Sequence, residues 1–290
     1  MKRFVAIILT AFIMLAMTGC ASESETETKY FLTEAVYEFA EDYVQKTVYH
    51  FDDEWTATGY TTYTNGEVEQ EVTYTRDENG NLTMTMVSGE QTNTVRNVYT
   101  KDADGKVVKL EMYQDDTLYS TTDYTYDADG NYATQTQTNA MTGMVLKITY
   151  TADGKILSQD TTGQDGLQSG AEYTYDENGN EIKMVNYYIA NGQPATTENI
   201  TEYGPDGKRT KVTTTDYNHE GNVTRSYYTE YTYDGNVETS QIVQDGEVTS
   251  KTVATYDDAG NTLMTEHHSP SSDHVTRFTY TYEAVEVPVE

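Results

Sequence analysis

A short motif, Tyr-Thr-Tyr-Asp-x-x-Gly-Asn, recurs along most of this chain and limits its fold more than any other feature. Its two clearest copies span residues 124–131 and 173–180. The residue before the Asp position marks each copy, and successive markers lie 23 to 30 residues apart. The ten markers are Phe51, Arg76, Lys101, Tyr126, Tyr150, Tyr175, Tyr203, Tyr233, Tyr256 and Tyr282. A period this regular indicates an array of similar units in place of separate domains.

Each copy predicts a strand that ends in a hairpin turn. Tyr and Thr favour strands, and the Tyr-x-Tyr alternation places both rings on one face of a sheet. Asp begins the turn by accepting a bond from a backbone N–H two residues on, and Gly supplies the positive φ. We therefore interpret the turn residues as structural. The clearest are Asp77, Gly80, Asp102, Gly105, Asp127, Gly130, Asp176, Gly179, Asp257 and Gly260.

A second set of turns separates successive copies, so each unit contains two strands of roughly 8 to 11 residues. The second set comprises Asn65-Gly66, Ser88-Gly89, Asp115-Asp116, Thr142-Gly143, Asp165-Gly166, Asn191-Gly192, Glu220-Gly221, Asp245-Gly246 and residues 269–273. Residues 31–39 and 43–51 add an opening pair. Residues 34–46 also have helical propensity, but the Val and Tyr residues that flank them favour strands. The sequence thus predicts about twenty antiparallel strands in a meander.

Tyrosine replaces the usual aliphatic core in this prediction. The chain has 27 Tyr and a hydrophobic fraction of only 36%. A Tyr ring buries apolar area while its hydroxyl stays in water, so rows of rings can hold a sheet together. The second strand of several units carries aliphatic residues that we expect beside these rows: Leu82, Met84, Met86, Val108, Leu110, Met112, Ile156, Ile182 and Met184.

A sheet of this size is not expected to be flat. Open sheets beyond about ten strands usually curl or split. We therefore predict an all-β fold in which one large sheet is twisted or curled, an open and partly rolled barrel being one form of it. A β-propeller fits less well, because its blades repeat every 40 to 50 residues or so.

These copies resemble the YD-repeat (RHS-repeat) family of bacterial surface and secreted proteins over roughly residues 49–283. The resemblance implies long, curving antiparallel sheets that can wind into a shell. Large members of the family also carry a conserved processing block and a C-terminal toxin. Only seven residues follow Glu283, so we carry over the local fold and not toxin delivery.

The N-terminus predicts export and lipid attachment. Lys2 and Arg3 precede a fourteen-residue apolar stretch, Phe4–Met17, which is too short to span a membrane and is typical of a signal peptide. The following Thr18-Gly19-Cys20 resembles the lipobox of bacterial lipoproteins, although Met17 stands where that family prefers Leu. The resemblance implies that Cys20, the only cysteine, receives a diacylglyceryl group and becomes the mature N-terminus.

The predicted organisation is a signal peptide at 1–19, lipidated Cys20 with a flexible acidic tether over 20–29, and the β array over 30–290. The formal charge of −30 becomes −32 when Lys2 and Arg3 leave with the signal peptide. Nucleic-acid binding needs clustered cations and is excluded on this ground, and docking on anionic lipid heads is disfavoured. We expect a cell-envelope protein, lipid-anchored to a bacterial membrane and facing outward.

Several residues raise the question of a metal or ligand site. The turn acids superficially resemble the start of a calcium loop, but the twelve-residue loop and its final Glu are missing, so capping of the turn is favoured. His267, His268, Asp273 and His274 flank one hairpin, yet neighbours in a strand point to opposite faces. Trp55, the only Trp, replaces the usual Gly and suits packing at the end of the array. We expect no metal and no cofactor.

The predicted function is a surface lipoprotein with a non-catalytic scaffold or binding domain that takes a glycan or protein ligand. The chain contains no recognisable catalytic motif, so we do not expect an enzyme. One alternative is a carbohydrate-binding or adhesive protein that uses a Tyr-rich sheet face. Another is an enzyme with an unrecognised pair of carboxylates. The edge strands of an open sheet also allow self-association.

Overall fold

The structure is a computed structural model that describes residues 26–40, 43–164, 166–190, 192–270 and 275–288. Contacts within the chain define two units. The smaller unit combines Met1–Phe31 with Tyr282–Glu290, and its described residues belong to strands. The barrel discussed below lies within the larger unit, Leu32–Thr281. The predicted signal peptide and Cys20 fall outside the described residues.

All regular elements among the described residues are β-strands, twenty in number. They are β1 (Thr26–Ala40), β2 (Tyr43–Phe51), β3 (Ala57–Thr64), β4 (Glu67–Arg76), β5 (Leu82–Ser88), β6 (Gln91–Lys101), β7 (Val107–Gln114), β8 (Thr117–Tyr126), β9 (Tyr132–Asn139), β10 (Val145–Tyr150), β11 (Ile156–Gly163), β12 (Gly166–Tyr175), β13 (Glu181–Ala190), β14 (Gln193–Tyr203), β15 (Arg209–Tyr217), β16 (Val223–Asp234), β17 (Val237–Gln244), β18 (Glu247–Tyr256), β19 (Thr262–His268) and β20 (Val275–Pro288).

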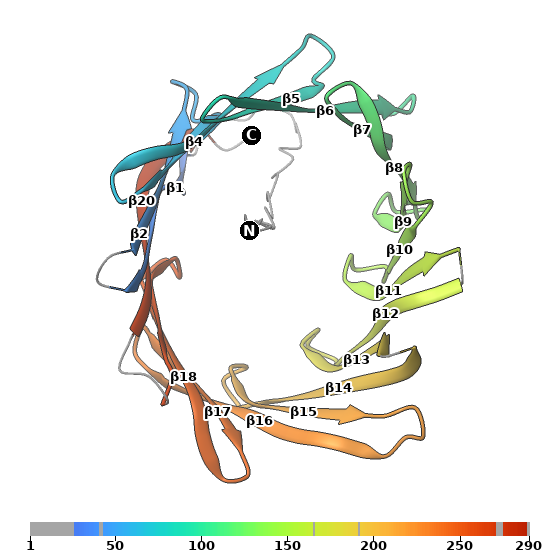
Figure 1. Ribbon diagram of the computed structural model, residues 1–290, viewed down its shortest axis with the longest axis vertical. Coiled ribbons are helices and arrows are strands. Elements are labelled where there is room, and N and C mark those ends of the chain that lie inside the picture. Colours follow the sequence, from blue (N-terminus) through green and yellow to red (C-terminus); the bar gives the residue numbers. More distant parts are fainter. Residues whose placement is uncertain (1–25, 41–42, 165, 191, 271–274, 289–290) are drawn as a thin grey trace. The chain divides into compact units, whose positions relative to one another are not determined.

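The predicted antiparallel meander is confirmed. Each strand pairs with the next along the chain, and β1 also pairs with β20, so the sheet closes (Figure 1). Contacts within the larger unit join the two strands of this seam. The rings of Tyr37 and Phe278 lie 4.6 Å apart, Arg277 is 3.6 Å from Glu38, and the Thr33 hydroxyl donates to the Thr281 carbonyl at 3.1 Å. The sequence prediction allowed an open, partly rolled barrel, whereas the sheet in the structure is closed.

The first strand differs from the sequence prediction at its start. It begins at Thr26, so residues 26–29 of the predicted tether belong to β1. Thr is a strong strand former, and Thr26 and Thr28 alternate here with charged residues. Strand structure over 34–40 and 43–46 agrees with the choice of strand over helix for that region.

Side chains alternate between the two faces of the wall, as the motif predicts. In β8, Thr122, Tyr124 and Tyr126 are buried or half-buried, whereas Asp123 and Thr125 between them are exposed. We call the face that carries Tyr124 and Tyr126, together with its equivalents, the tyrosine face. Opposed residues in neighbouring strands share a face.

The predicted aliphatic neighbours of the tyrosine rows lie where they were expected. The pairing register sets Tyr74 opposite Met84, Tyr99 opposite Leu110 and Tyr173 opposite Met184. Aromatic pairs continue the rows: the rings of Tyr126 and Tyr132 stack at 5.0 Å, and those of Tyr132 and Tyr150 lie 6.1 Å apart. Rings and thioethers therefore form the apolar layer of this sheet.

This layer is not a packed interior. The buried residues among those described are few: Tyr60, Val72, Ala171, Val243, Thr61, Thr62, Ser120, Thr122 and Thr214. At about 4.8 Å per strand, a closed wall of twenty strands has a circumference of roughly 95 Å, which is too wide for its own side chains to fill. Backbone pairing and half-buried rings, more than a core, hold the wall together.

The turns gather on two rims. The turns that follow even-numbered strands lie on one edge, which we call the motif rim because most of them carry the Asp motif. The opposite rim carries the remaining turns. Many exposed aliphatic residues lie near the opposite rim. Eight of them have side chains that are 36% to 59% exposed: Val44, Val68, Val87, Leu167, Ile189, Val223, Val248 and Val275.

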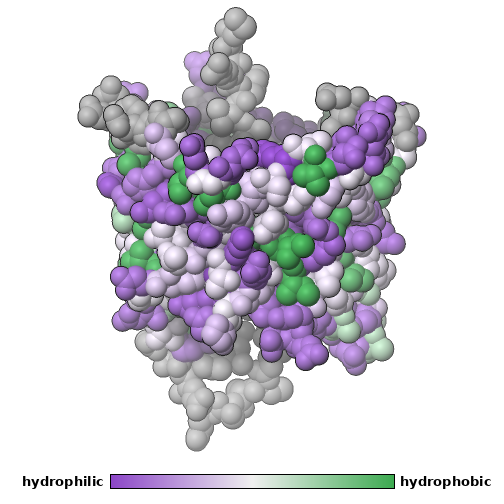
Figure 2. Space-filling view, turned by 90° about the horizontal axis from the view of Figure 1, so that it is seen from below, coloured by the Kyte–Doolittle hydropathy of each residue, from purple (hydrophilic) through white to green (hydrophobic). Residues whose placement is uncertain are grey.

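The side of the molecule seen in Figure 2 is predominantly hydrophilic. Figure 2 shows hydrophobic residues as separate patches among hydrophilic ones. Charged pairs also occur well inside the strands, such as Lys109 with Glu111 and Lys183 with Glu198. Among the described residues, no helix is long and apolar enough to cross a membrane.

Candidate functional site

The predicted turn residues lie at turns of the motif rim. In the turn of residues 127–131, the Asp127 carboxylate accepts from the backbone N–H groups of Asp129 at 3.0 Å and Asn131 at 2.9 Å. The Asp127 N–H donates to the Asn131 carbonyl at 2.9 Å, and Gly130 has a φ of 88°. The same carboxylate bonds are made by Asp52, Asp77, Asp102, Asp176 and Asp257.

These bonds determine the chemistry of the turn acids. N–H donors on the carboxylate, first among them the backbone of Asn131, hold the pKa of Asp127 below its usual value. In Asp77, Asp176 and Asp257, the side-chain amide at the end of the turn contributes most to a lowered pKa. Oxygens that already accept two or three hydrogen bonds are poor ligands for calcium. Within the described residues, no three His, Cys, Asp or Glu side chains come together as a metal site.

We predict that Asp127→Ala lowers the urea midpoint of the barrel, because two backbone N–H groups lose their acceptor. Asp127→Asn is expected to retain most of the stability, because Asn218 already caps a turn by accepting from the N–H groups of Glu220 and Asn222. Urea unfolding followed by circular dichroism measures both variants. Equal losses in the two variants would contradict the capping role.

Neighbouring turns are tied together along the motif rim. Three marker tyrosines, Tyr126, Tyr175 and Tyr203, donate their hydroxyl groups to the carbonyl at the start of the previous return strand. Tyr126 bonds Val107 at 2.7 Å, and Tyr175 bonds Ile156 at 2.8 Å. Lys155 adds a cation–π contact, its Nζ lying 5.3 Å from the centre of the Tyr175 ring.

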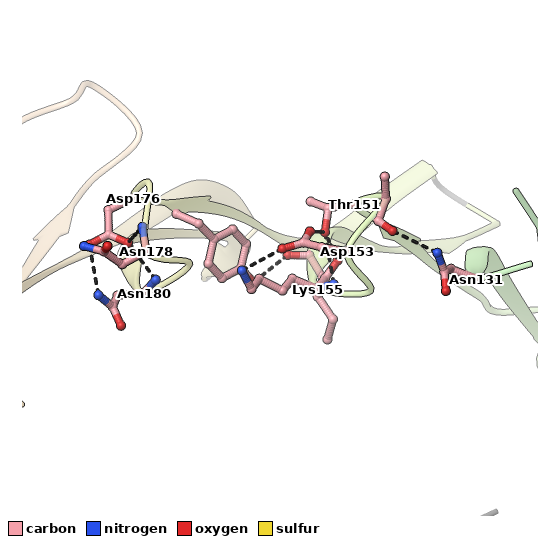
Figure 3. Close-up of polar contacts among 10 residues, drawn as sticks. Asn131, Thr151, Asp153, Lys155, Asp176, Asn178 and Asn180 are labelled. Carbon is pink, nitrogen blue, oxygen red and sulfur yellow. Dashed lines mark hydrogen bonds and ion pairs between the residues drawn. The ribbon is translucent and has the colours of Figure 1, made fainter. Parts of the chain in front are cut away.

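Figure 3 shows two adjacent turns of this rim, one with Asp153 and Lys155 and the next with Asp176, Asn178 and Asn180. Lys155 reaches Asp153 at 2.7 Å. That ion pair and the Thr151 hydroxyl lower the pKa of Asp153 to about 2. Most groups on this stretch of the rim are thus engaged in holding the turns together.

One stretch of the motif rim breaks the pattern. In all motif-rim hairpins but that of β16 and β17, the first residue of the return strand pairs with the marker, on the tyrosine face. In the first five hairpins it is Ala57, Leu82, Val107, Tyr132 or Ile156. In the next three the residue paired with the marker is charged: Glu181, Arg209 and Glu238. We call these three residues, with Tyr203, Tyr233 and Tyr256, the polar arc.

A groove of about 670 Å³ lies within the polar arc. Tyr203, Tyr233, Tyr256, Lys208, Arg209 and Glu238 line it. The hairpin at its centre is irregular: β16 and β17 pair without a bulge up to Asp234 and Val237, and two residues connect them where most neighbouring turns have five.

Two cations lie over tyrosine rings at the groove. The Lys208 Nζ lies 4.6 Å from the centre of the Tyr233 ring, and the Arg209 guanidinium lies 4.7 Å from that of Tyr231. Tyr203 donates to the Glu181 carbonyl at 2.9 Å. The groove therefore offers hydrogen-bond donors, acceptors and aromatic rings side by side.

The phenols of the groove are protonated at neutral pH, and burial raises their pKa further. It raises the pKa of Tyr233 to about 12, with help from the charge and hydrogen bond of Glu238. The pKa of Tyr256 also rises through burial. Burial raises the pKa of the Glu181 carboxyl, and Arg209 opposes that rise. The hydroxyl groups are therefore neutral, and those of Tyr203 and Tyr233 already bond groups of the protein.

A second hollow, of about 390 Å³, lies near the opposite rim and is lined mainly by Val44, Val48 and Tyr63. Its single cation, Lys46, forms an ion pair with Glu34. This hollow has few polar groups with which to orient a ligand. The groove of the polar arc is the better candidate site.

The remaining candidate residues do not form a site. His267 bonds the Thr252 hydroxyl at 2.9 Å and packs edge-on against Phe278. Its neighbour His268 points to the other face, and Asp273 and His274 lie outside the described residues. The Trp55 ring lies 5.5 Å from that of Phe51, in agreement with a packing role.

Sequence reasoning missed the polar arc because every copy of the motif was treated as equivalent. Two signals were present in the sequence. The marker spacings from Tyr175 to Tyr256 are the irregular ones, 28, 30 and 23 residues. Charged residues also replace apolar ones at the position paired with the marker. A local departure of this kind from an otherwise consistent pattern is expected at functional sites.

No family model matches this chain, and no curated protein matches it. Solved structures do. TcdB2-TccC3-TEV is 14% identical with a TM-score of 0.35 over 80% of this chain, which spans only 15% of that protein's chain. A porin-like protein from Bacteroides vulgatus is 12% identical with a TM-score of 0.39, covering 88% of this chain and 99% of that one. Another from Bacteroides uniformis is 11% identical with a TM-score of 0.37, over 87% and 96%. The chain is similar to these proteins in its β architecture.

Proposed function

We propose that this chain is an exported lipoprotein in which an acylated Cys20 holds a non-catalytic binding barrel at the outer side of a bacterial membrane. The basic head, apolar stretch and lipobox-like Thr18-Gly19-Cys20 support export and acylation. Since β1 begins at Thr26, only residues 21–25 separate the acylated cysteine from the first strand.

The polarity of the wall is the observation that carries this proposal. A barrel that spans a bilayer needs an apolar outer band about 25 Å tall. Here the tyrosine face includes Ser120 and Thr122 in mid-strand, and the other face includes the opposed pair Lys211 and Glu230. Neither face offers a continuous apolar band, so the barrel stays in water and depends on its lipid for attachment.

Binding fits the groove better than catalysis does. Both oxygens of Asp257 accept hydrogen bonds from its own turn, from Ala259 and Asn261. Glu238 hydrogen-bonds the Tyr233 hydroxyl. Carboxylates engaged in this way are poorly placed to act as an acid–base pair. Turnover of a bound ligand would contradict this part of the proposal.

We predict that Cys20→Ser abolishes incorporation of labelled fatty acid and moves the protein from the detergent phase to the aqueous phase on phase partitioning. The reason is that the thiol is the only acylation site proposed and the wall has no apolar band of its own. Ser22→Ala, in the same segment, is the matched control and should keep both the label and the detergent phase. A Cys20→Ser protein that stays in the membrane would show that the barrel itself inserts.

A further inference from the structure

We propose that the polar arc binds a neutral, linear oligosaccharide. The rings of Tyr203, Tyr233 and Tyr256 contact the faces of the sugars, and Arg209 and Glu238 bond their hydroxyl groups. The inference rests on the proposed function in one respect, that the barrel binds and does not transform its ligand.

The fold does not require a charge opposite the marker residue. Other hairpins place Val107 or Ile156 opposite the marker residue. Those hairpins close with turns of five residues, as the Arg209 hairpin does. Arg209 is exposed, but the half-buried charge of Glu238 costs free energy that an aliphatic residue at the same position avoids. Glu238 is therefore best explained by a ligand, and the exposed Arg209 lines the same groove.

The groove combines aromatic rings with hydrogen-bond donors and acceptors. Sugars present apolar faces edged with hydroxyls, and a phenol ring offers apolar area next to a hydroxyl. Lys208 and Arg209 donate, while Glu238 and Asp258 accept. With Asp257, the lining holds two cations and three carboxylates. This near balance favours an uncharged ligand over a polyanion.

The size of the site and the spacing of its rings also suit an oligosaccharide. Its volume of about 670 Å³ falls in the range of small-molecule sites. Marker tyrosines recur on alternate strands, so neighbouring markers are two strand spacings apart, roughly 9.6 Å. That step is close to the length of two sugar units in an extended chain. A linear oligosaccharide laid along the rim would meet successive rings in register.

The test is calorimetric titration of the full acylated chain, in detergent micelles, with neutral linear hexasaccharides of glucose, N-acetylglucosamine, mannose and xylose. At least one is expected to bind the wild type. Arg209→Val and Glu238→Leu, which restore the residue type of the other hairpins, should each weaken that binding about tenfold or more while keeping the urea midpoint. If none of the four hexasaccharides binds the wild-type protein, the inference is overturned.

Arg96→Val is the matched control. Its guanidinium also stacks on a tyrosine, 4.5 Å from the centre of the Tyr113 ring, but lies outside the arc. It should leave the affinity unchanged, and an equal loss in Arg96→Val and Arg209→Val overturns the assignment to the arc. A chain that is acylated at Cys20 but binds no sugar refutes the ligand and not the anchor. A chain that binds sugar without acylation refutes the anchor and not the ligand.

Discussion

Gly59→Ala is expected to destabilise the barrel by about 3 kcal/mol or more, in the upper range for single substitutions. Gly59 lies in β3 with a φ of 154°, a conformation that L-residues rarely adopt. A Cβ atom there would stand 2.0 Å from the carbonyl oxygen of Val72. Because that oxygen belongs to the backbone of a buried residue in the paired strand, it cannot move aside without breaking the pairing.

Gly66→Ala is the matched control. Gly66 also has a positive φ, 86°, but a Cβ atom there meets nothing within 4 Å. The free energy of unfolding of Gly66→Ala should fall by only about 1 kcal/mol, the cost of holding a residue with a side chain at positive φ. The free energy of unfolding from urea titration measures both variants. Similar losses would show that conformation alone, and not the close approach to β4, makes Gly59 necessary.

Raising the pH above 10 should unfold the barrel cooperatively. Burial is the first cause that raises the pKa of Tyr60, Tyr124 and Tyr187 to about 12, from an ordinary value of 10. Below pH 10, these groups are protonated in both the folded and the unfolded chain and do not affect the balance. Between pH 10 and about 12, the unfolded chain releases protons that the folded chain retains, so the free energy of unfolding falls as the pH rises.

Circular dichroism and phenolate absorbance, followed together, check this prediction. Strand content and the protonated tyrosines should be lost in one transition. Tyr124→Phe should move the midpoint to higher pH, because it removes one group that ionises on unfolding, and it should have little effect on the urea midpoint at neutral pH. Phenolate that forms while the strand signal persists would show that the rings ionise within an intact wall.

Local patterns in the sequence determined the strands and the turns. Tyr124 and Tyr126 share a face because strand residues alternate, whatever lies beside them. Asp127 and Gly130 form their turn through bonds confined to residues 127–131. Such features depend on neighbours a few residues away, so they could be predicted from the sequence alone. The start of the first strand is an exception. The tether was predicted from composition to end at residue 29, but β1 begins at Thr26, because composition is a weak guide to where strand pairing begins.

The polar arc needed the register of neighbouring strands. The sequence shows Glu181, Arg209 and Glu238 as three scattered charges. Only the pairing puts each opposite a marker tyrosine on one face, and only the adjacency of the hairpins joins them into a groove. Their roles could not be deduced from a motif in which all copies look alike.

The sequence by itself determined that this chain forms about twenty antiparallel strands with tyrosine rows in place of an aliphatic core. Only the tertiary structure decided that the sheet closes and where its site lies. Closure depends on the curvature summed over every strand, and on contacts such as Tyr37 with Phe278 and Arg277 with Glu38, between residues at opposite ends of the array. Closure could not be predicted from the turn motifs or from the alternation of residues within a strand, because these are local features and curvature is a property of the whole sheet.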